Sequence, residues 1–289
     1  MMKHNYRLLI LASILSAAFT SCELYNPAEK IPSYIRIEKI TLSTTYITEG
    51  SNSSKITDAW LYIDDQLIGC FELPATIPVL AEGIHQLKIR PGIKVNGIAS
   101  NRSPYPFFSN IDQQVDLQKG AVLNLSPTVT YLPTASIILV EDFEDPGVTI
   151  DSTAFSNSNL KTITLPDPNV FEGNKSAIGN TDPVKTFFEV ATVNPYVLPT
   201  GGAPIFLEFN YKCNYPFIVS IIARGAATTN QFTVLNFNAS TEWNKTYTYL
   251  TPTVSSASSA IDYKIVWGVL NNSGTDSTAL LLDNIKLIK

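Results

Sequence analysis

The clearest candidates for binding chemistry are aromatic residues that alternate near the end of the chain. Trp243, Tyr247 and Tyr249 share one face of a predicted strand with Lys245. Aromatic rings stack against the C–H faces of sugars, and neighbouring polar groups bind the sugar hydroxyls. The polar candidates for this second role are Glu208, Asn210 and Arg224. An aromatic stripe with a period of two is also typical of a core, so the pattern allows either a sugar platform or a buried face.

Catalytic chemistry has weaker support. Glycoside hydrolysis needs two carboxylates about 5–10 Å apart. Four acidic residues are candidates for this role: Glu189, Glu208, Asp262 and Asp283. None lies in a recognisable active-site motif, and the sequence has no Gly-x-Ser-x-Gly and no phosphate-binding loop. We therefore expect a protein that is not an enzyme and that requires no cofactor.

His85 is the only histidine after residue 21. A general base is chemically reasonable there, because the pKa of histidine lies near neutrality. However, His85 lies in a predicted strand with Leu87 and Ile89, so we expect a structural role. A single histidine also cannot form a histidine-rich zinc site.

Composition excludes two further classes of protein. Apolar residues make up 45% and charged residues 16% of the 289 residues, which excludes a wholly disordered chain. The formal net charge is -5, whereas a nucleic-acid-binding protein needs a basic face for phosphates. We expect no nucleic-acid partner.

Residues 1–21 have the parts of a secretory signal. Basic residues precede an apolar run over 8–19, which is shorter than the roughly 20 residues of a membrane-spanning helix. Two small residues then precede Cys22. This stretch resembles a bacterial lipoprotein signal, although Phe19 stands where leucine is usual. An ordinary secretory signal with a chance cysteine is the alternative.

The resemblance implies that cleavage leaves Cys22 lipidated and that its acyl chains anchor the protein. Glu23 follows the cysteine where inner-membrane lipoproteins commonly have aspartate, so the resemblance favours the outer membrane and leaves the leaflet open. Residues 22–31 are polar and contain proline, which is typical of a tether. Removing residues 1–21 takes away two basic and no acidic residues, which changes the net charge from -5 to -7.

The rest of the sequence predicts an all-β chain with two modules, at residues 32–132 and 137–289. Short alternating runs recur between Gly, Pro, Asn and Asp clusters, and no ten-residue stretch has sustained helical periodicity. Within the second module, Trp267 alternates in phase with other apolar residues, so we expect it in the core. Residues 205–212 also alternate, with one apolar face and an opposite face that carries Phe206, Glu208, Asn210 and Lys212. We expect that opposite face to contact solvent, because each sheet of a sandwich has one inner face.

Residues 58–93 of the first module contain, in order, a strand, the turn Asp64-Asp65, a strand with glycine, a Leu-Pro pair and a Gly-x-His strand. This order resembles the PEGA-type and related immunoglobulin-like modules of bacterial surface proteins. The resemblance implies an antiparallel immunoglobulin-like sandwich that serves as a spacer or adhesion surface.

The loop that follows combines two prolines with Tyr105, Phe107 and Phe108. A stiff apolar protrusion of this kind would fit a groove on a partner protein. The alternative is a loop that folds back and caps the end of the sandwich.

The second module opens with residues 137–145 and closes with 279–288, and short motifs lie at 172–176 and 241–245. Their order resembles the galactose-binding-like jelly rolls found in carbohydrate-binding modules and adhesion domains. The resemblance implies a C-terminal jelly-roll sandwich, but one fold hosts many functions, so it does not identify a ligand.

Jelly rolls of this kind often hold a structural calcium between their first and last strands. The resemblance therefore implies Glu144 and Asp283 as metal ligands, with backbone carbonyls of residues 173–176 completing the oxygen shell. The alternative is that both acids cap strand ends in water. Cys70 and Cys213 lie in different modules, and we expect them to be buried free thiols rather than a disulfide.

These features together predict a lipid-anchored outer-membrane protein that binds a glycan or another surface ligand through its C-terminal jelly roll. The alternative is an accessory structural subunit of an outer-membrane protein complex that binds no sugar and contacts a protein partner through the aromatic loop.

Overall fold

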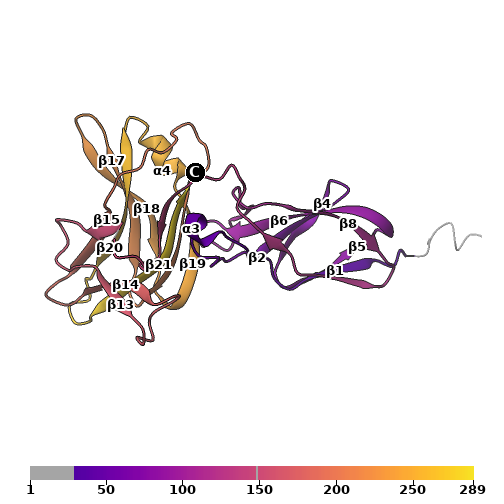
Figure 1. Cartoon of the computed structure of the whole chain (residues 1–289), viewed down its shortest axis with the longest axis horizontal. Coiled ribbons are helices and arrows are strands. Elements are labelled where there is room, and N and C mark those ends of the chain that lie inside the picture. Colours follow the sequence, from indigo (N-terminus) through magenta and orange to yellow (C-terminus); the bar gives the residue numbers. More distant parts are fainter. Residues whose placement is uncertain (1–28, 148) are drawn as a thin grey trace, which may run out of the picture.

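The chain forms two β modules that lie end to end (Figure 1). The computed structural model describes residues 29–147 and 149–289, so the predicted signal and Cys22 lie outside the described residues. Nearly all regular structure is strand, which confirms the all-β class. None of the helices in the described part is long and apolar enough to cross a membrane.

The N-terminal module, here residues 29–132, has three small sheets. Its elements are β1 (Ser33–Ile37), β2 (Thr41–Leu42), α3 (Tyr46–Glu49), β3 (Asp58–Ile63), β4 (Gln66–Glu72), β5 (Ala75–Val79), β6 (Gly83–Lys94), β7 (Arg102–Pro104), β8 (Ile111–Leu117), β9 (Val122–Leu125) and β10 (Thr128–Val129). The largest sheet has the order β4-β3-β6-β7, with β8 also paired to β6. The order β5-β1-β9 forms a second sheet, and β10 pairs with β2.

The C-terminal module, here residues 137–289, is a two-sheet jelly-roll sandwich. Its elements are β11 (Ile137–Glu141), β12 (Ile150–Ser152), β13 (Lys161–Thr164), β14 (Lys175–Thr181), β15 (Phe187–Thr192), β16 (Phe206–Cys213), β17 (Phe217–Arg224), β18 (Thr229–Phe237), β19 (Ser240–Tyr249), α4 (Thr251–Ser256), β20 (Asp262–Leu270) and β21 (Thr278–Ile288). One sheet has the order β13-β14-β21-β16-β19, with β11 paired to β21. The other has the order β12-β15-β20-β17-β18, so β18 and β19 are both edge strands.

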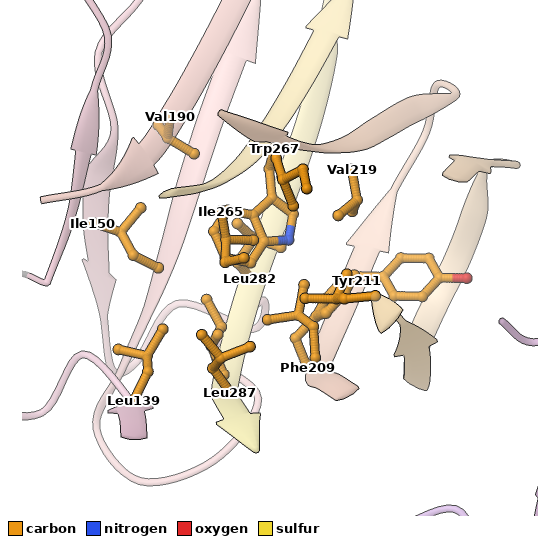
Figure 2. Close-up of a cluster of buried hydrophobic side chains, with 14 of the residues drawn as sticks. Leu139, Ile150, Val190, Phe209, Tyr211, Val219, Ile265, Trp267, Leu282 and Leu287 are labelled. Atoms are coloured by element: carbon orange, nitrogen blue, oxygen red, sulfur yellow. The ribbon is translucent and has the colours of Figure 1, made fainter. Parts of the chain in front are cut away.

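Apolar side chains from both sheets fill the core of the C-terminal module (Figure 2). Trp267 is fully buried, as its alternation predicts, and its ring packs edge-on against Phe209 with 5.9 Å between ring centroids. Leu207, which shares the inner face of β16 with Phe209, is also fully buried. The predicted inner face of residues 205–211 is therefore confirmed.

Most of the opposite face of β16 does not contact solvent, contrary to our expectation, and Lys212 at its end is partly exposed. Phe206, Glu208 and Asn210 are all buried, because the N-terminal module packs over this sheet. The ring of Tyr105 lies 5.1 Å from that of Phe206, and Ser53 donates a 3.0 Å hydrogen bond to Asn210. An outer sheet face of the C-terminal module thus becomes an interface within the chain.

The aromatic loop of the N-terminal module forms much of this interface. Tyr105, Phe107 and Phe108 are buried in an apolar cluster that also contains Phe206 and Tyr247 of the C-terminal module. The loop therefore folds back onto the protein's own second module, and these three side chains are not exposed to a separate protein partner in this structure. The loop does present an apolar surface, as the sequence indicates, but the surface that it contacts belongs to the same chain.

The two cysteines of the described residues are free thiols. Cys213 is buried, as expected. Cys70, on the edge strand β4, is exposed, so the expectation of a buried thiol is wrong for this residue.

Candidate functional site

The structure covers the side chains that were expected to form a sugar platform. Tyr247 is 2% exposed, and its hydroxyl accepts a 3.0 Å hydrogen bond from the backbone N–H of Lys55. Tyr249 is half-buried and packs against the same apolar cluster. Trp243 is half-buried, with 5.0 Å between its ring centroid and that of Phe171. These rings pack between elements of the protein, so they do not form an open platform.

The expected polar ligands are divided between two sheets. Glu208 and Asn210 lie on β16 beneath the N-terminal module, whereas Arg224 lies on β17 of the opposite sheet. The guanidinium of Arg224 donates to both carboxylate oxygens of Asp262, at 2.5 and 2.7 Å. This ion pair holds the pKa of Asp262 below its usual value. The structure therefore does not bring the three predicted residues to one site.

Glu208 is the centre of a buried polar network between the modules. It accepts hydrogen bonds from Tyr105 at 2.7 Å and Tyr131 at 3.0 Å, and Nζ of Lys245 lies 3.6 Å from its Oε2. Lys286 donates to Tyr131 at 3.3 Å. Burial raises the pKa of both tyrosines and lowers the pKa of Lys286 to about 8. These groups satisfy one another, so we interpret the network as structural.

The expected calcium ligands do not fit a calcium shell in this structure. Oε1 of Glu144 accepts the backbone N–H groups of Asn174 and Lys175, at 2.6 and 2.8 Å. The loop therefore directs N–H donors toward Glu144. The expected calcium shell would need carbonyl oxygens of the loop there instead. Asp283 is buried and accepts the Ser176 hydroxyl at 2.5 Å. Across residues 29–147 and 149–289, no group of three or more His, Cys, Asp or Glu residues is arranged to hold a metal ion.

A different site lies where the N-terminal module meets the edge of the sandwich. This cleft, which we call the seam cleft, has a volume of about 310 Å³. The C-terminal module contributes residues from β16 and from or next to the edge strands β18 and β19. The N-terminal module contributes the segment before β3, the end of β6 and the turn after it. Its lining consists of Lys55, Thr57, Lys94, Asn96, Gly97, Ile98, Tyr211, Leu235, Asn236, Phe237, Asn238, Asn244, Lys245, Thr246 and Tyr247.

The turn after β6 fixes one wall of the seam cleft. Asn96 and Gly97 have φ values of 58° and 69°, the left-handed region that Asn and Gly adopt most readily. The backbone N–H of Asn96 donates to the carbonyl of Tyr247, and its side-chain oxygen accepts the N–H of Tyr249 at 2.8 Å. These bonds attach the turn to edge strand β19, so the position of the wall depends on the packing of the modules.

The polar groups of the seam cleft belong mainly to amides, hydroxyls and lysine. Nζ of Lys55 donates to Oδ1 of Asn244 at 2.5 Å, and Nδ2 of Asn244 donates to the Tyr211 hydroxyl at 2.9 Å. The Thr246 hydroxyl is buried and has no hydrogen-bond partner within the described part of the chain. A buried hydroxyl without a partner is costly.

Sequence reasoning did not identify the seam cleft. The Asn96-Gly97 pair is a turn signal, and the alternation of Asn236 and Asn238 around an apolar residue is a weak sign of an exposed strand face. Neither signal shows that these segments meet, because they belong to different modules and the contact depends on tertiary packing.

Sequence comparison gives no relatives: no protein-family model and no curated protein matches the chain. Several solved carbohydrate-binding modules are similar in structure to about half of it. One is the family 11 module from Clostridium thermocellum in complex with a beta-1,3-1,4-mixed-linked tetrasaccharide, with 12% identity over 53% of this chain and 94% of the module, at a TM-score of 0.36. Another is the family 30 module of a cellulosomal cellulase of Clostridium thermocellum, with 18% identity over 53% of this chain and 96% of the module, at a TM-score of 0.39. At such low identity and TM-score, this likeness does not extend to a ligand.

Proposed function

We propose that the protein is a non-catalytic glycan-binding protein of the cell envelope and that the seam cleft binds the glycan. The observation that carries this proposal is the cleft lining, which combines the amides of Asn236, Asn238 and Asn244 with apolar side chains such as Ile98 and Leu235. An amide both donates and accepts hydrogen bonds, so it pairs with a sugar hydroxyl in either orientation. Apolar walls suit the C–H faces of a sugar ring.

The lining also supports binding without cleavage. Of the described residues that line the seam cleft, none is Asp or Glu. The usual route of glycoside hydrolysis needs a pair of carboxylates beside the scissile bond. Glu189, one of the acids considered for that role, is buried and accepts hydrogen bonds from Thr153 and Gln231 away from the cleft.

The proposed location is the outer membrane, with a lipid anchor at Cys22. Support comes from the lipoprotein-like sequence around that cysteine. β1, the first strand after it, lies toward the end of the N-terminal module that is remote from the C-terminal module (Figure 1). An anchor at Cys22 would therefore hold the seam cleft away from the membrane by the length of the N-terminal module.

A glycan array probed with residues 29–289 tests the proposed function. We expect the wild-type chain to bind a defined set of glycans and the double variant Asn236→Ala/Asn238→Ala to lose that signal. The matched control is Asn159→Ala, which removes an exposed amide outside the cleft. A wild-type chain that binds no glycan, or a double variant that binds as well as the control, would contradict the proposal.

A second candidate function has one observation in its favour. Leu67 and Ile68 are exposed on the edge strand β4, and exposed apolar edge strands are sites where other chains can pair. This favours an accessory subunit that contacts a protein partner through β4. Recovery of a stable partner by the wild-type protein in detergent, and its loss from a Leu67→Lys/Ile68→Lys variant, would support that function.

A further inference from the structure

The charged side chains that line the seam cleft favour one chemical class of glycan. Lys55, Lys94 and Lys245 all line it, and its described lining has no carboxylate, although the chain as a whole has 25 acidic and 20 basic residues. A cleft that carries one sign of charge concentrates ligands of the opposite sign. We propose that the seam cleft binds a saccharide with a carboxylate or sulfate group and that Lys55 binds this group. The inference rests on the proposed glycan-binding function.

The three lysines differ in their present partners. Lys245 is buried, and its Nζ lies 3.6 Å from Oε2 of Glu208. Nζ of Lys94 lies 2.7 Å from Oε1 of Glu72, so Lys94 already has an anionic partner. Nζ of Lys55 donates instead to the neutral side-chain oxygen of Asn244, and no carboxylate of the described residues lies within ion-pair distance of it. An ammonium group has three donors, and its hydrogen bonds to anions are stronger than those to neutral acceptors. Lys55 is therefore the cation with donors left for a ligand.

The surroundings of Lys55 favour an anion beside it. Partial burial and the nearby charge of Lys94 both lower the pKa of Lys55. Repulsion between the two ammonium groups favours a ligand whose negative charge lies near both of them. A neutral sugar would leave that repulsion unchanged, whereas a carboxylate or sulfate would offset it.

The interface fixes Lys55 in place. Its backbone N–H donates to the Tyr247 hydroxyl on β19, so this segment of the N-terminal module is attached to the C-terminal module. Asn244 donates to Tyr211, which directs its side-chain oxygen toward Lys55. The N-terminal module thus supplies the positive charge and the C-terminal module supplies most of the amides. The site exists only when both modules are packed together.

Matched pairs of saccharides test this inference. The probes are oligogalacturonates with their methyl esters, and sulfated galactan oligosaccharides with their desulfated forms, all presented to residues 29–289 on an array that also carries neutral glycans. We expect binding to the acidic member of at least one pair and weaker binding to its neutral counterpart. The two pairs distinguish a carboxylate from a sulfate. Raising the salt concentration should weaken the acidic interaction.

Variants of Lys55 then test whether this side chain binds the negative group of the saccharide. Lys55→Gln should bind the acidic saccharide about tenfold more weakly, the loss expected for one charged hydrogen bond. Lys55→Arg should retain most of the affinity because it keeps the charge. Lys161→Gln removes an exposed lysine on β13 and should bind like the wild type. Thermal unfolding of each variant is the check that it is folded.

The possible failures are distinguishable. If the chain binds only neutral glycans, or if Lys55→Gln binds the acidic saccharide as tightly as the wild type, the inference about charge is wrong and the glycan function stands. If the chain binds no glycan on the array, the proposed function fails and the inference fails with it.

Discussion

The Tyr105 hydroxyl donates a 2.7 Å hydrogen bond to Oε1 of Glu208, although the two residues are 103 positions apart and lie in different modules. Glu208 is fully buried and also accepts a hydrogen bond from Tyr131. The carboxylate has these donors only when the N-terminal module covers the outer face of β16. Packing between the modules is therefore a condition for burying this charge.

We predict that Glu208→Gln lowers the free energy of unfolding by about 3–5 kcal/mol, the usual cost of breaking a buried ion pair. The substitution removes the carboxylate that lies 3.6 Å from Nζ of the buried Lys245 and that also stabilises the charge of the buried Lys286. Urea denaturation of residues 29–289 measures the change.

Glu242→Gln is the matched control for this prediction, because Glu242 is exposed on the neighbouring strand β19. We expect it to change the free energy of unfolding by no more than about 0.5 kcal/mol. An equally small change for Glu208→Gln would show that the buried carboxylate is not needed for the interface.

We also predict that residues 29–289 unfold in one calorimetric transition. Phe206, Tyr247 and Ile288 belong to strands of the C-terminal module, but they pack in the apolar cluster of the N-terminal module. Unfolding either module would expose them, so the two modules should lose structure together. In a two-state transition the calorimetric and van 't Hoff enthalpies agree. Two resolved transitions in the calorimetric scan would show instead that the modules are independent.

Sequence patterns predict the faces of the C-terminal strands but not what covers them. The alternation at residues 205–211 correctly assigns Leu207 and Phe209 to the core. The same alternation places Glu208 and Asn210 together on the opposite face, and a single β-sandwich would leave that face in solvent. Here another module of the same chain lies over it. Periodicity records which side chains share a face and contains no information on a covering module that is distant in sequence.

The seam cleft could not be predicted from the sequence for the same reason. The prolines beside Tyr105 and its aromatic neighbours indicate a stiff apolar surface. The partner of that surface lies in the same chain, which composition alone does not reveal. The seam cleft joins Lys55, Asn96 and Asn238 from three distant segments. No spacing rule connects them, so the site could be identified only from the packed modules.

Chelation tests the expected calcium site, and we predict that a chelator leaves the melting temperature unchanged. The oxygens of Glu144 accept N–H groups of the loop, which would have to be displaced before a cation could bind. Glu144→Gln should lower the free energy of unfolding by about 1–2 kcal/mol with or without added calcium, through the loss of charged hydrogen bonds. A calcium-dependent rise in the melting temperature of the wild type that is absent from Glu144→Gln would establish a metal site.

The buried ammonium of Lys286 should make stability depend on pH. Burial lowers its pKa from 10.5 to about 8 in the folded protein. Above pH 8 the folded state therefore releases a proton that the unfolded state still binds, so the free energy of unfolding rises with pH. The cost of burying the charge is fully present below pH 8. We expect Lys286 to contribute a gain on the order of 1 kcal/mol by about pH 9.5, before tyrosines in the unfolded chain ionise near pH 10. Burial raises the pKa of Cys70 and Cys213, so ionisation of these thiols in the unfolded chain offsets part of that gain.

Lys286→Met tests whether this residue causes the rise. Methionine fills a similar volume without a charge, so the increase in the free energy of unfolding between pH 8 and about 9.5 should become smaller. Burial also lowers the pKa of Lys245, so part of the increase should remain. Lys161→Met removes an exposed lysine and should leave the pH dependence as it is in the wild type. Urea denaturation at a series of pH values gives the three curves. If Lys286→Met retains the full wild-type increase, Lys286 does not titrate in this range and its ammonium is better solvated than its burial indicates.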